Sequence, residues 1–296
     1  MQEKLPTVAL ALGGGGARGL AHVHVLEALN ELGIRPVCVA GSSIGAVMGA
    51  ALCSNITGAE IRAHLMATLA NRTEMAARLW RLRPSLMGGV ARSAATLRFG
   101  QIDIARVMEA FLMPLPETFE ELSIPLTVTG TDFYGHREVH FTHGDLRSAL
   151  AASSSIPGVF RPVRREGRLY VDGNVYNPCP FDLVKGKADI VVAVDVVGAP
   201  VGDPLREPPT LDCLIGSNQL MMRSIIDARA IASPPDILLR PEPAPVRALD
   251  FHRAEEIMGQ SESLKTELIE ALGRHGFNAP VQGEEMPAVE PDADAA

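Results

Sequence analysis

The chain has 296 residues, of which 47% are hydrophobic and 4% aromatic, and its formal net charge at pH 7 is −8. This length accommodates one large α/β domain or two small ones, each with a buried core. The acidic balance argues against nucleic acid as the main partner, because binding phosphates requires a basic surface. No apolar run reaches the roughly 18 residues that a membrane-spanning helix needs.

The first residues and the cysteines predict a cytoplasmic protein. The opening MQEKLPTVALAL has only a short apolar stretch before four glycines, which suits a first strand better than a signal peptide. The four cysteines lie far apart and form no C-x-x-C pair. They predict small core residues in a reducing compartment rather than disulfides or metal ligands. We therefore expect no metal site and no cofactor.

Strand and helix patterns alternate along the chain. Short apolar runs typical of strands cover 7–12, 35–41, 125–131, 137–142, 168–171, 190–197 and 236–240. Helical spacing of apolar residues covers 19–32, 44–52, 58–70, 103–112, 147–152, 211–232 and 253–273. This alternation predicts an α/β fold with a mostly parallel sheet and helices on both of its faces. The acidic, Pro- and Ala-rich residues 278–296 are predicted to be a disordered tail.

A glycine-rich segment, GGGGARG at 13–19, lies between the first predicted strand and helix. Such a turn gathers backbone N–H groups at a helix N-terminus and attracts negative charge. It contains G-x-G-x-x-G, but a dinucleotide site also needs an acid about 20 positions later, where GIRPVCVAGSS has none. The lysine of a P-loop is absent as well. Two interpretations remain open, a plain tight turn and an oxyanion hole.

Residues 41–45, Gly-Ser-Ser-Ile-Gly, match G-x-S-x-G between a predicted strand and a predicted helix, with Ser43 at the centre. A nucleophile on such a turn needs a strained backbone, and Gly41 and Gly45 let the strand and the helix pass closely. The helix N-terminus would stabilise negative charge that develops at Ser43. Ser42 lacks glycines at these offsets, and we interpret it as a neighbour.

A serine nucleophile needs a group that accepts its proton, and the histidines do not suggest one. In an α/β-hydrolase the histidine follows the acid along the chain. Only His252 and His275 occur late enough, and neither lies at the junction of a strand and a loop. A Ser–His–Asp triad is therefore unsupported.

A carboxylate offers an alternative base. Asp172 follows a predicted strand and precedes a Gly-Asn turn, where functional residues of open α/β sheets gather. An Asp-Gly pair by itself is also an ordinary turn cap. Asp132 and Asp195 are rival acids that we rank lower, because Asp195 is embedded in a strand and Asp132 stands just beyond another.

Four blocks carry a resemblance to a known family: GGGGARGLAHVHVLEAL, AGSSIGAVMGA, AASSSIPGVFRPV and VDGNVYNPCP. Together with PLTVTGTDFYGHREVHFTHGDL, they resemble the bacterial branch of the patatin-like phospholipase family. The resemblance covers residues 7–197, and more loosely LDFHRAEEI. It implies a core domain over 7–197, with residues 198–277 as an extension packed on the same domain.

The resemblance implies a three-layer α/β/α fold and a Ser–Asp dyad without histidine, in which Ser43 is the nucleophile and Asp172 the base. Burial beside Ser43 would raise the pKa of Asp172 and strengthen it as a base. One departure is Asn174, since the family usually has Gly or Ala after Asp-Gly; a side chain there is expected to narrow or polarise the site. The oxyanion hole maps to Gly14, Gly15, Gly16, Ala17 and Arg18.

The implied activity is hydrolysis of lipid acyl esters, as in a phospholipase A or a lysophospholipase. Two alternatives stay open: a general carboxylesterase or thioesterase, and a non-catalytic regulatory or adaptor protein of the same fold. Residues 71–98 hold six arginines, one acid and the only tryptophan. This segment predicts contact with an anionic membrane, at the inner face if the protein is cytoplasmic, or a lid; a surface helix followed by a loop is the plainer alternative.

Overall fold

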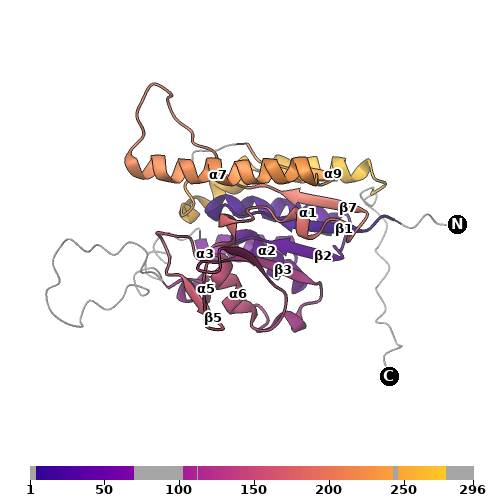
Figure 1. The fold of residues 1–296 in the computed structure, drawn as a ribbon. Helices are drawn as coiled ribbons and strands as arrows, with labels where there is room; N and C mark the ends of the chain where they lie inside the picture. The colour runs from indigo at the N-terminus through magenta and orange to yellow at the C-terminus, as the bar shows by residue number, and fades with distance from the viewer. Residues whose placement is uncertain (1–4, 70–102, 112, 243–245, 278–296) are drawn as a thin grey trace.

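A central eight-stranded sheet organises the computed structural model, which describes residues 5–69, 103–111, 113–242 and 246–277 (Figure 1). The strand order is β5-β6-β3-β2-β1-β7-β8, and β4 pairs with β3. The strands β3, β2, β1, β7 and β8 are parallel, whereas β4, β5 and β6 run antiparallel to their neighbours. The strands are β1 Val8–Leu12, β2 Cys38–Gly41, β3 Leu126–Asp132, β4 Arg137–Phe141, β5 Val163–Arg165, β6 Arg168–Val171, β7 Ile190–Val194 and β8 Ile237–Leu239.

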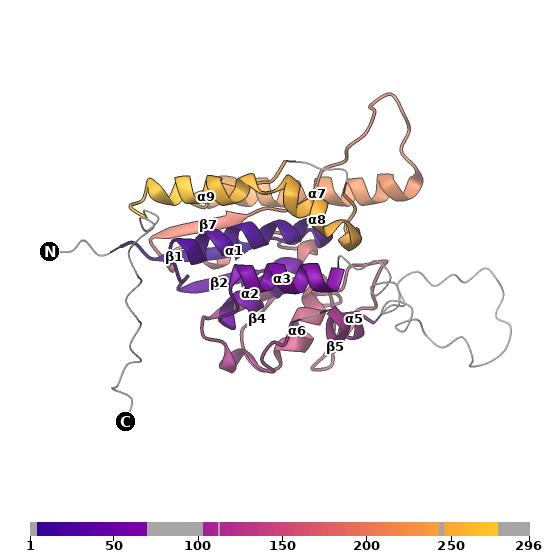
Figure 2. The ribbon, with the colours of Figure 1, turned by 180° about the vertical axis from the view of Figure 1, so that it is seen from behind.

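Helices cover both faces of this sheet. The α-helices are α1 His22–Glu31, α2 Ile44–Cys53, α3 Gly58–Leu69, α5 Ile104–Phe111, α6 Leu146–Ser153, α7 Thr210–Ala232, α8 Ala254–Gln260 and α9 Ser263–Gly273. Short 3-10 turns are η1 Gly16–Ala21, η2 Phe119–Glu121, η3 Gly173–Val175, η4 Phe181–Leu183 and η5 Phe251–Arg253. α1 packs between α9 and α3, as Figure 2 shows. Within the described part of the chain, no helix combines the length and the apolar character needed to cross a membrane.

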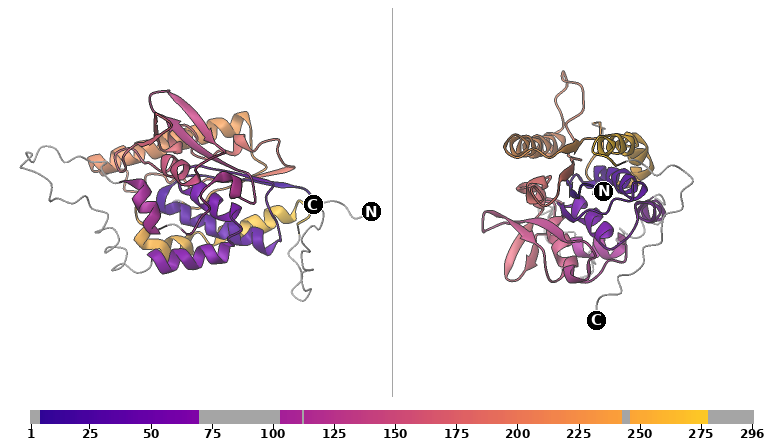
Figure 3. Two further views of the ribbon diagram at one scale, coloured as in Figure 1. Left: turned by 90° about the horizontal axis from the view of Figure 1, so that it is seen from below. Right: turned by 90° about the vertical axis from the view of Figure 1, so that its right-hand side faces the viewer.

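The two faces of the sheet carry side chains of different size, because neighbouring residues of a strand point to opposite faces. Val8, Leu10 and Leu12 belong to the larger core, which is built with α1, α2 and α9. Ala9 and Ala11 belong to the smaller core, which η4 and α7 cover. The end-on view in Figure 3 shows α7 on the side of the sheet away from α2. The predicted α/β fold with helices on both faces is confirmed.

Most predicted elements are present, and their ends shift by a few residues. The helix predicted over 19–32 starts as the 3-10 turn η1, and the one predicted over 253–273 is divided into η5, α8 and α9. The strand predicted over 190–197 ends at Val194. The three residues of β5 were not predicted, because so short an antiparallel strand leaves no periodic pattern. The predicted tail 278–296 and segment 71–98 lie outside the described residues.

Candidate active site

Ser43 lies on a sharp turn between β2 and α2, with backbone angles φ 52° and ψ −124°. A residue with a side chain adopts this region only at a cost in free energy. Glycines on either side make the turn sterically feasible. A methyl group on Gly41 would lie 2.5 Å from the Cα of Ala46, and one on Gly45 would lie 2.1 Å from the main-chain oxygen of Leu12. The spacing of the predicted elbow therefore has a direct steric cause.

The Ser43 hydroxyl donates a hydrogen bond of 2.9 Å to Oδ2 of Asp172. Both side chains are almost inaccessible, with relative exposures of 3% and 2%. The sheet brings them together across 129 positions of sequence. β2 and β6 pair with the same side of β3, β2 along residues 126–128 and β6 along residues 131–132, whereas β4 occupies the opposite side. Because β6 runs antiparallel to β3, its carboxyl end meets the carboxyl end of β2.

Hydrogen bonds hold the carboxylate of Asp172 in place. Its Oδ1 accepts the main-chain N–H of Asn174 at 2.8 Å. Its own main-chain N–H donates to the carbonyl of Ser155 at 3.1 Å, and its carbonyl accepts from the hydroxyl of Thr131 at 2.9 Å. Burial raises the pKa of Asp172 to about 7, against the opposing effect of the hydrogen bonds from Asn174 and Ser43. Near neutral pH the carboxyl group is therefore poised between its two protonation states.

The glycine-rich loop after β1 presents a smaller set of free amides than the sequence predicts. Gly14 donates its N–H to the carbonyl of Pro178 at 2.9 Å, and Ala17 donates to the carbonyl of Ala248 at 2.7 Å. The amides of Gly15 and Gly16 donate no hydrogen bond to any group in the described ranges. These two N–H groups are therefore available to an anionic oxygen.

One further amide without a described partner lies outside the glycine-rich loop. The N–H of Ile44, which follows Ser43 at the start of α2, donates to no described group either. Its neighbour, the N–H of Ser43, donates to the hydroxyl of Ser153 at 2.9 Å. The signal was present in the motif itself, because the residue after the nucleophile of an elbow usually contributes an oxyanion-hole amide.

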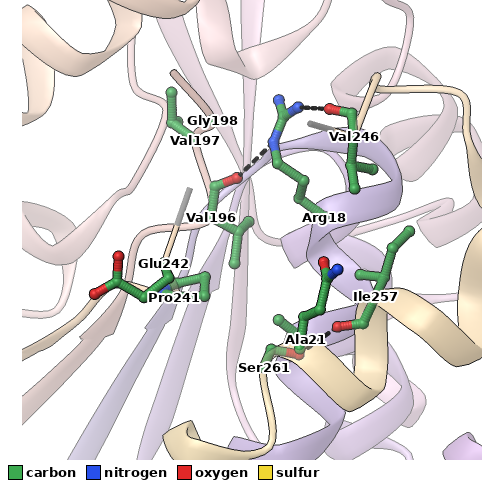
Figure 4. Close-up of a pocket in the computed structure, with 11 residues that line it drawn as sticks. Arg18, Ala21, Val196, Val197, Gly198, Pro241, Glu242, Val246, Ile257 and Ser261 are labelled. Carbon is green, nitrogen blue, oxygen red and sulfur yellow. Dashed lines mark hydrogen bonds between the residues drawn. The ribbon is translucent and has the colours of Figure 1, made fainter. Parts of the chain in front are cut away.

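The side chain of Arg18 holds the glycine-rich loop against neighbouring segments (Figure 4). Its Nε donates to the carbonyl of Val196 at 3.2 Å, and its Nη1 to that of Val246 at 2.6 Å. Burial lowers the pKa of Arg18 to about 10, with the charges of Asp195 and Asp250 opposing. The cavity beside it, of about 30 Å³, is not lined by either Ser43 or Asp172. The guanidinium therefore holds the loop in place without lining the site at Ser43 and Asp172.

Asn174 links three parts of the site. Its Oδ1 accepts the hydroxyl of Ser42 at 2.8 Å, and its main-chain N–H binds Asp172. A methyl group on Gly14 would come within 2.1 Å of the same Oδ1, so the carboxamide packs directly on the glycine-rich loop. The hydrogen bond to Asn174 gives Ser42, which was predicted to be only a neighbour of the nucleophile, a structural role in the site.

The histidines lie elsewhere. His252 and His275 are exposed, and within the described structure Ser43 hydrogen-bonds no histidine. His22, which no sequence motif marks as a site residue, is completely buried and donates from Nε2 to the carbonyl of Gly13 at 2.8 Å. Burial lowers the pKa of His22 to about 4, so its ring is neutral at physiological pH and steadies the glycine-rich loop.

The rival acids are engaged in ion pairs. Asp132 contacts Arg168 at 2.8 Å, and Asp195 lies between Arg223 at 3.0 Å and Arg240 at 2.9 Å. Neither is therefore free to serve as a base. Among the described residues, no three His, Cys, Asp or Glu side chains are arranged to hold a metal ion.

The described part of the chain is thus an α/β fold with a strained turn at Ser43 and a buried hydrogen bond between Ser43 and Asp172. The model of the patatin-like phospholipase family matches residues 10–185. The chain therefore belongs to this family.

Curated relatives carry related names. An uncharacterized NTE family protein of Mycobacterium bovis is 39% identical over 204 residues, which are 68% of this chain and 52% of that protein. Lysophospholipase nte1 of Aspergillus niger is 28% identical over 299 residues, which cover 91% of this chain and 18% of the relative. The chain thus spans about half the length of the mycobacterial relative. Among solved structures, VipD from Legionella pneumophila has a TM-score of 0.44 at 14% identity, over 89% of this chain and 67% of its own.

Proposed function

We propose that the protein is a serine-dependent hydrolase of lipid acyl esters, with Ser43 as nucleophile and Asp172 as base. The observation that carries the proposal is the buried hydrogen bond of 2.9 Å from the Ser43 hydroxyl to a carboxyl group whose pKa burial raises to about 7. A base with a pKa near the working pH is effective in proton transfer, whereas an ordinary carboxylate is a weak base for a hydroxyl.

The reaction has two halves. Ser43 Oγ attacks the ester carbonyl carbon while its proton passes to Oδ2 of Asp172. The tetrahedral intermediate collapses, and the alcohol leaves with the proton from Asp172. In the second half Asp172 takes a proton from water, which attacks the acyl-enzyme. Collapse of that intermediate releases the fatty acid and returns the proton to Ser43.

The oxyanion would be held by backbone amides. Of the five predicted residues, Gly15 and Gly16 have N–H groups without a described partner, and Ile44 adds a third. Gly14, Ala17 and Arg18 would act by fixing the shape of the loop. Removing one donor from an oxyanion hole costs roughly 3 kcal/mol of transition-state stabilisation in other enzymes.

Membership of the patatin-like phospholipase family and the name of the Aspergillus lysophospholipase support an acyl lipid as substrate. A carboxylesterase or thioesterase would use the same dyad on another ester. A non-catalytic adaptor would need neither the dyad nor a strained backbone at Ser43. The strained turn at Ser43 therefore favours an enzyme.

The test compares the wild type with Ser43→Ala and Asp172→Asn on a soluble p-nitrophenyl ester and on lysophosphatidylcholine. We expect each variant to lose at least about a thousandfold in kcat/KM. A fluorophosphonate probe should label the wild type but not Ser43→Ala. Ser54→Ala, at the opposite end of α2, is the matched control and should behave as the wild type. Full activity in both site variants would refute the dyad, and a wild type without turnover or labelling would favour the adaptor.

A further inference from the structure

Two hairpins project from the edge of the sheet at which Ser43 and Asp172 meet. The first joins β3 to β4, and the second joins β5 to β6. Asp132 pairs with Tyr170, and the N–H of Phe133 donates to the carbonyl of Leu169 at 2.9 Å, so the base of one hairpin lies against the other. β6 then runs directly into Asp172. Both hairpins are therefore built onto the proposed active site.

The second hairpin is basic, although the chain as a whole carries a charge of −8. Arg165 turns inward, donating to the carbonyl of Asp145 at 2.7 Å and lying over the ring of Phe141. The other arginines of the two hairpins are exposed: Arg137, Arg161, Arg164 and Arg168. Three acids belong to the same hairpins: the exposed Glu166, the half-buried Glu138, which pairs with Arg229, and the buried Asp132, which pairs with Arg137 and Arg168. The exposed charge of this face is therefore positive.

Apolar and aromatic side chains lie beside these cations. Phe133 and Tyr134 are 49% and 75% exposed, and their rings meet edge to face with centroids 5.0 Å apart. Val175 and Tyr176, which are 44% and 37% exposed, follow Asp172 by three and four positions. The hydroxyl of Tyr176 donates to the carbonyl of His136 at 2.7 Å and joins this pair to the first hairpin. Solvent exposure of such side chains is typical of an interaction surface.

Short, well-defined turns present these groups. Glu166 and Gly167 both have positive φ, 50° and 77°, as expected of a two-residue hairpin turn. In the other hairpin, Oδ1 of Asp132 accepts the N–H of Gly135 at 2.9 Å. The backbone of the surface is therefore organised before any partner binds.

We propose that this surface, called the hairpin face (residues 133–137, 161–168 and 175–176), docks the protein onto an anionic phospholipid bilayer. The inference rests on the proposed function, because the bilayer holds the ester that Ser43 would attack. Exposed arginines next to amphipathic aromatic side chains suit the headgroup region, where charge and ring are accommodated together. A single free phosphate is a poorer fit, because these cations are solvent-exposed and spread over two hairpins rather than gathered in a buried cradle.

The experiment measures sedimentation with vesicles of phosphatidylcholine, with and without phosphatidylglycerol. We expect binding to the anionic vesicles, and a loss of at least about tenfold in partitioning for the double variant Arg161→Glu/Arg164→Glu. The matched control, Lys187→Glu/Arg274→Glu, makes the same change in net charge away from the hairpin face. Lys187 precedes β7 and Arg274 follows α9, at the end of the sheet where β1 begins (Figure 1). The control should bind as the wild type does.

The readouts separate the possible failures. Equal binding by both double variants would refute the proposed role of the hairpin face, as would release of the wild type from the vesicles by inorganic phosphate but not by sodium chloride at the same ionic strength. Hydrolysis of a soluble ester by Arg161→Glu/Arg164→Glu should stay at the wild-type rate, which shows that it folds. A wild type that binds anionic vesicles without hydrolysing any ester would refute the proposed function but would still support membrane docking by the hairpin face. Binding of the wild type to neither vesicle would refute the hairpin face alone.

Discussion

Replacing Asp172 by Asn should abolish hydrolysis and at the same time stabilise the folded protein, increasingly as the pH rises. The carboxyl group is 2% exposed, and burial raises its pKa from an ordinary 3.8 to about 7. Asparagine has the same shape, carries no charge and still accepts the N–H of Asn174. The variant therefore removes the cost of burying an anion while it keeps most of the local packing.

The size of the effect follows from proton linkage. Between pH 3.8 and about 7 the folded protein keeps a proton on Asp172 that the unfolded chain has released. The free energy of unfolding of the wild type therefore falls with rising pH, by about 1.4 kcal/mol per unit from this group. Over some three units the loss reaches about 4 kcal/mol. The advantage of Asp172→Asn should be near zero at pH 4, grow through pH 6 and level off above pH 7.

The assay is urea unfolding of the wild type and Asp172→Asn at intervals from pH 4 to pH 8. Asp132→Asn is the matched control, and it should change the free energy of unfolding in the opposite direction. Burial alone would raise the pKa of Asp132, but hydrogen bonds from Arg168 and Gly135 and the nearby cations outweigh it and lower the pKa. Asp132→Asn should therefore be less stable than the wild type above pH 4. A difference between wild type and Asp172→Asn that does not change with pH would refute the reasoning.

Three further predictions concern the same site and its scaffold. The kcat/KM of the wild type for a soluble ester should rise as the pH increases through about 7, because Asp172 must be ionised to accept a proton; a rate independent of pH between 5 and 9 would contradict this. Ser43→Gly should raise the free energy of unfolding by about 1 kcal/mol, because it relieves roughly 1–3 kcal/mol of backbone strain and loses part of this gain to the conformational entropy of glycine. Ser43→Ala keeps the strain and should show no gain in stability in urea unfolding. Gly45→Ala should cost about 3 kcal/mol because its Cβ would lie 2.1 Å from Leu12, whereas Gly259→Ala, with nothing within 4 Å in α8, should gain about 0.5–1 kcal/mol. Equal stability of these two alanine variants would show that the elbow does not need its glycine.

The elements that carry the site were predictable because their signals are local. The apolar run before the glycine-rich loop, the spacing of Gly41 and Gly45, and the turn after Asp172 each involve fewer than about ten residues. The parallel arrangement of the central strands followed from their alternation with helices. β5 escaped prediction, because three residues at the edge of the sheet pair only through their contact with β6.

The sequence by itself indicated most of the strands and helices in their order and the elbow around Ser43, and it favoured Asp172 over a histidine as the proposed base. Only the tertiary structure decided what those groups experience: the burial that raises the pKa of Asp172, the bonds that leave Gly15 and Gly16 free, and the joining of two hairpins into one face. The physical reason is the distance along the chain over which each effect acts. Propensity and periodicity act within a few residues, whereas hydrogen bonding, desolvation and exposure depend on segments such as Ser43 and Asp172 that meet across 129 positions of chain.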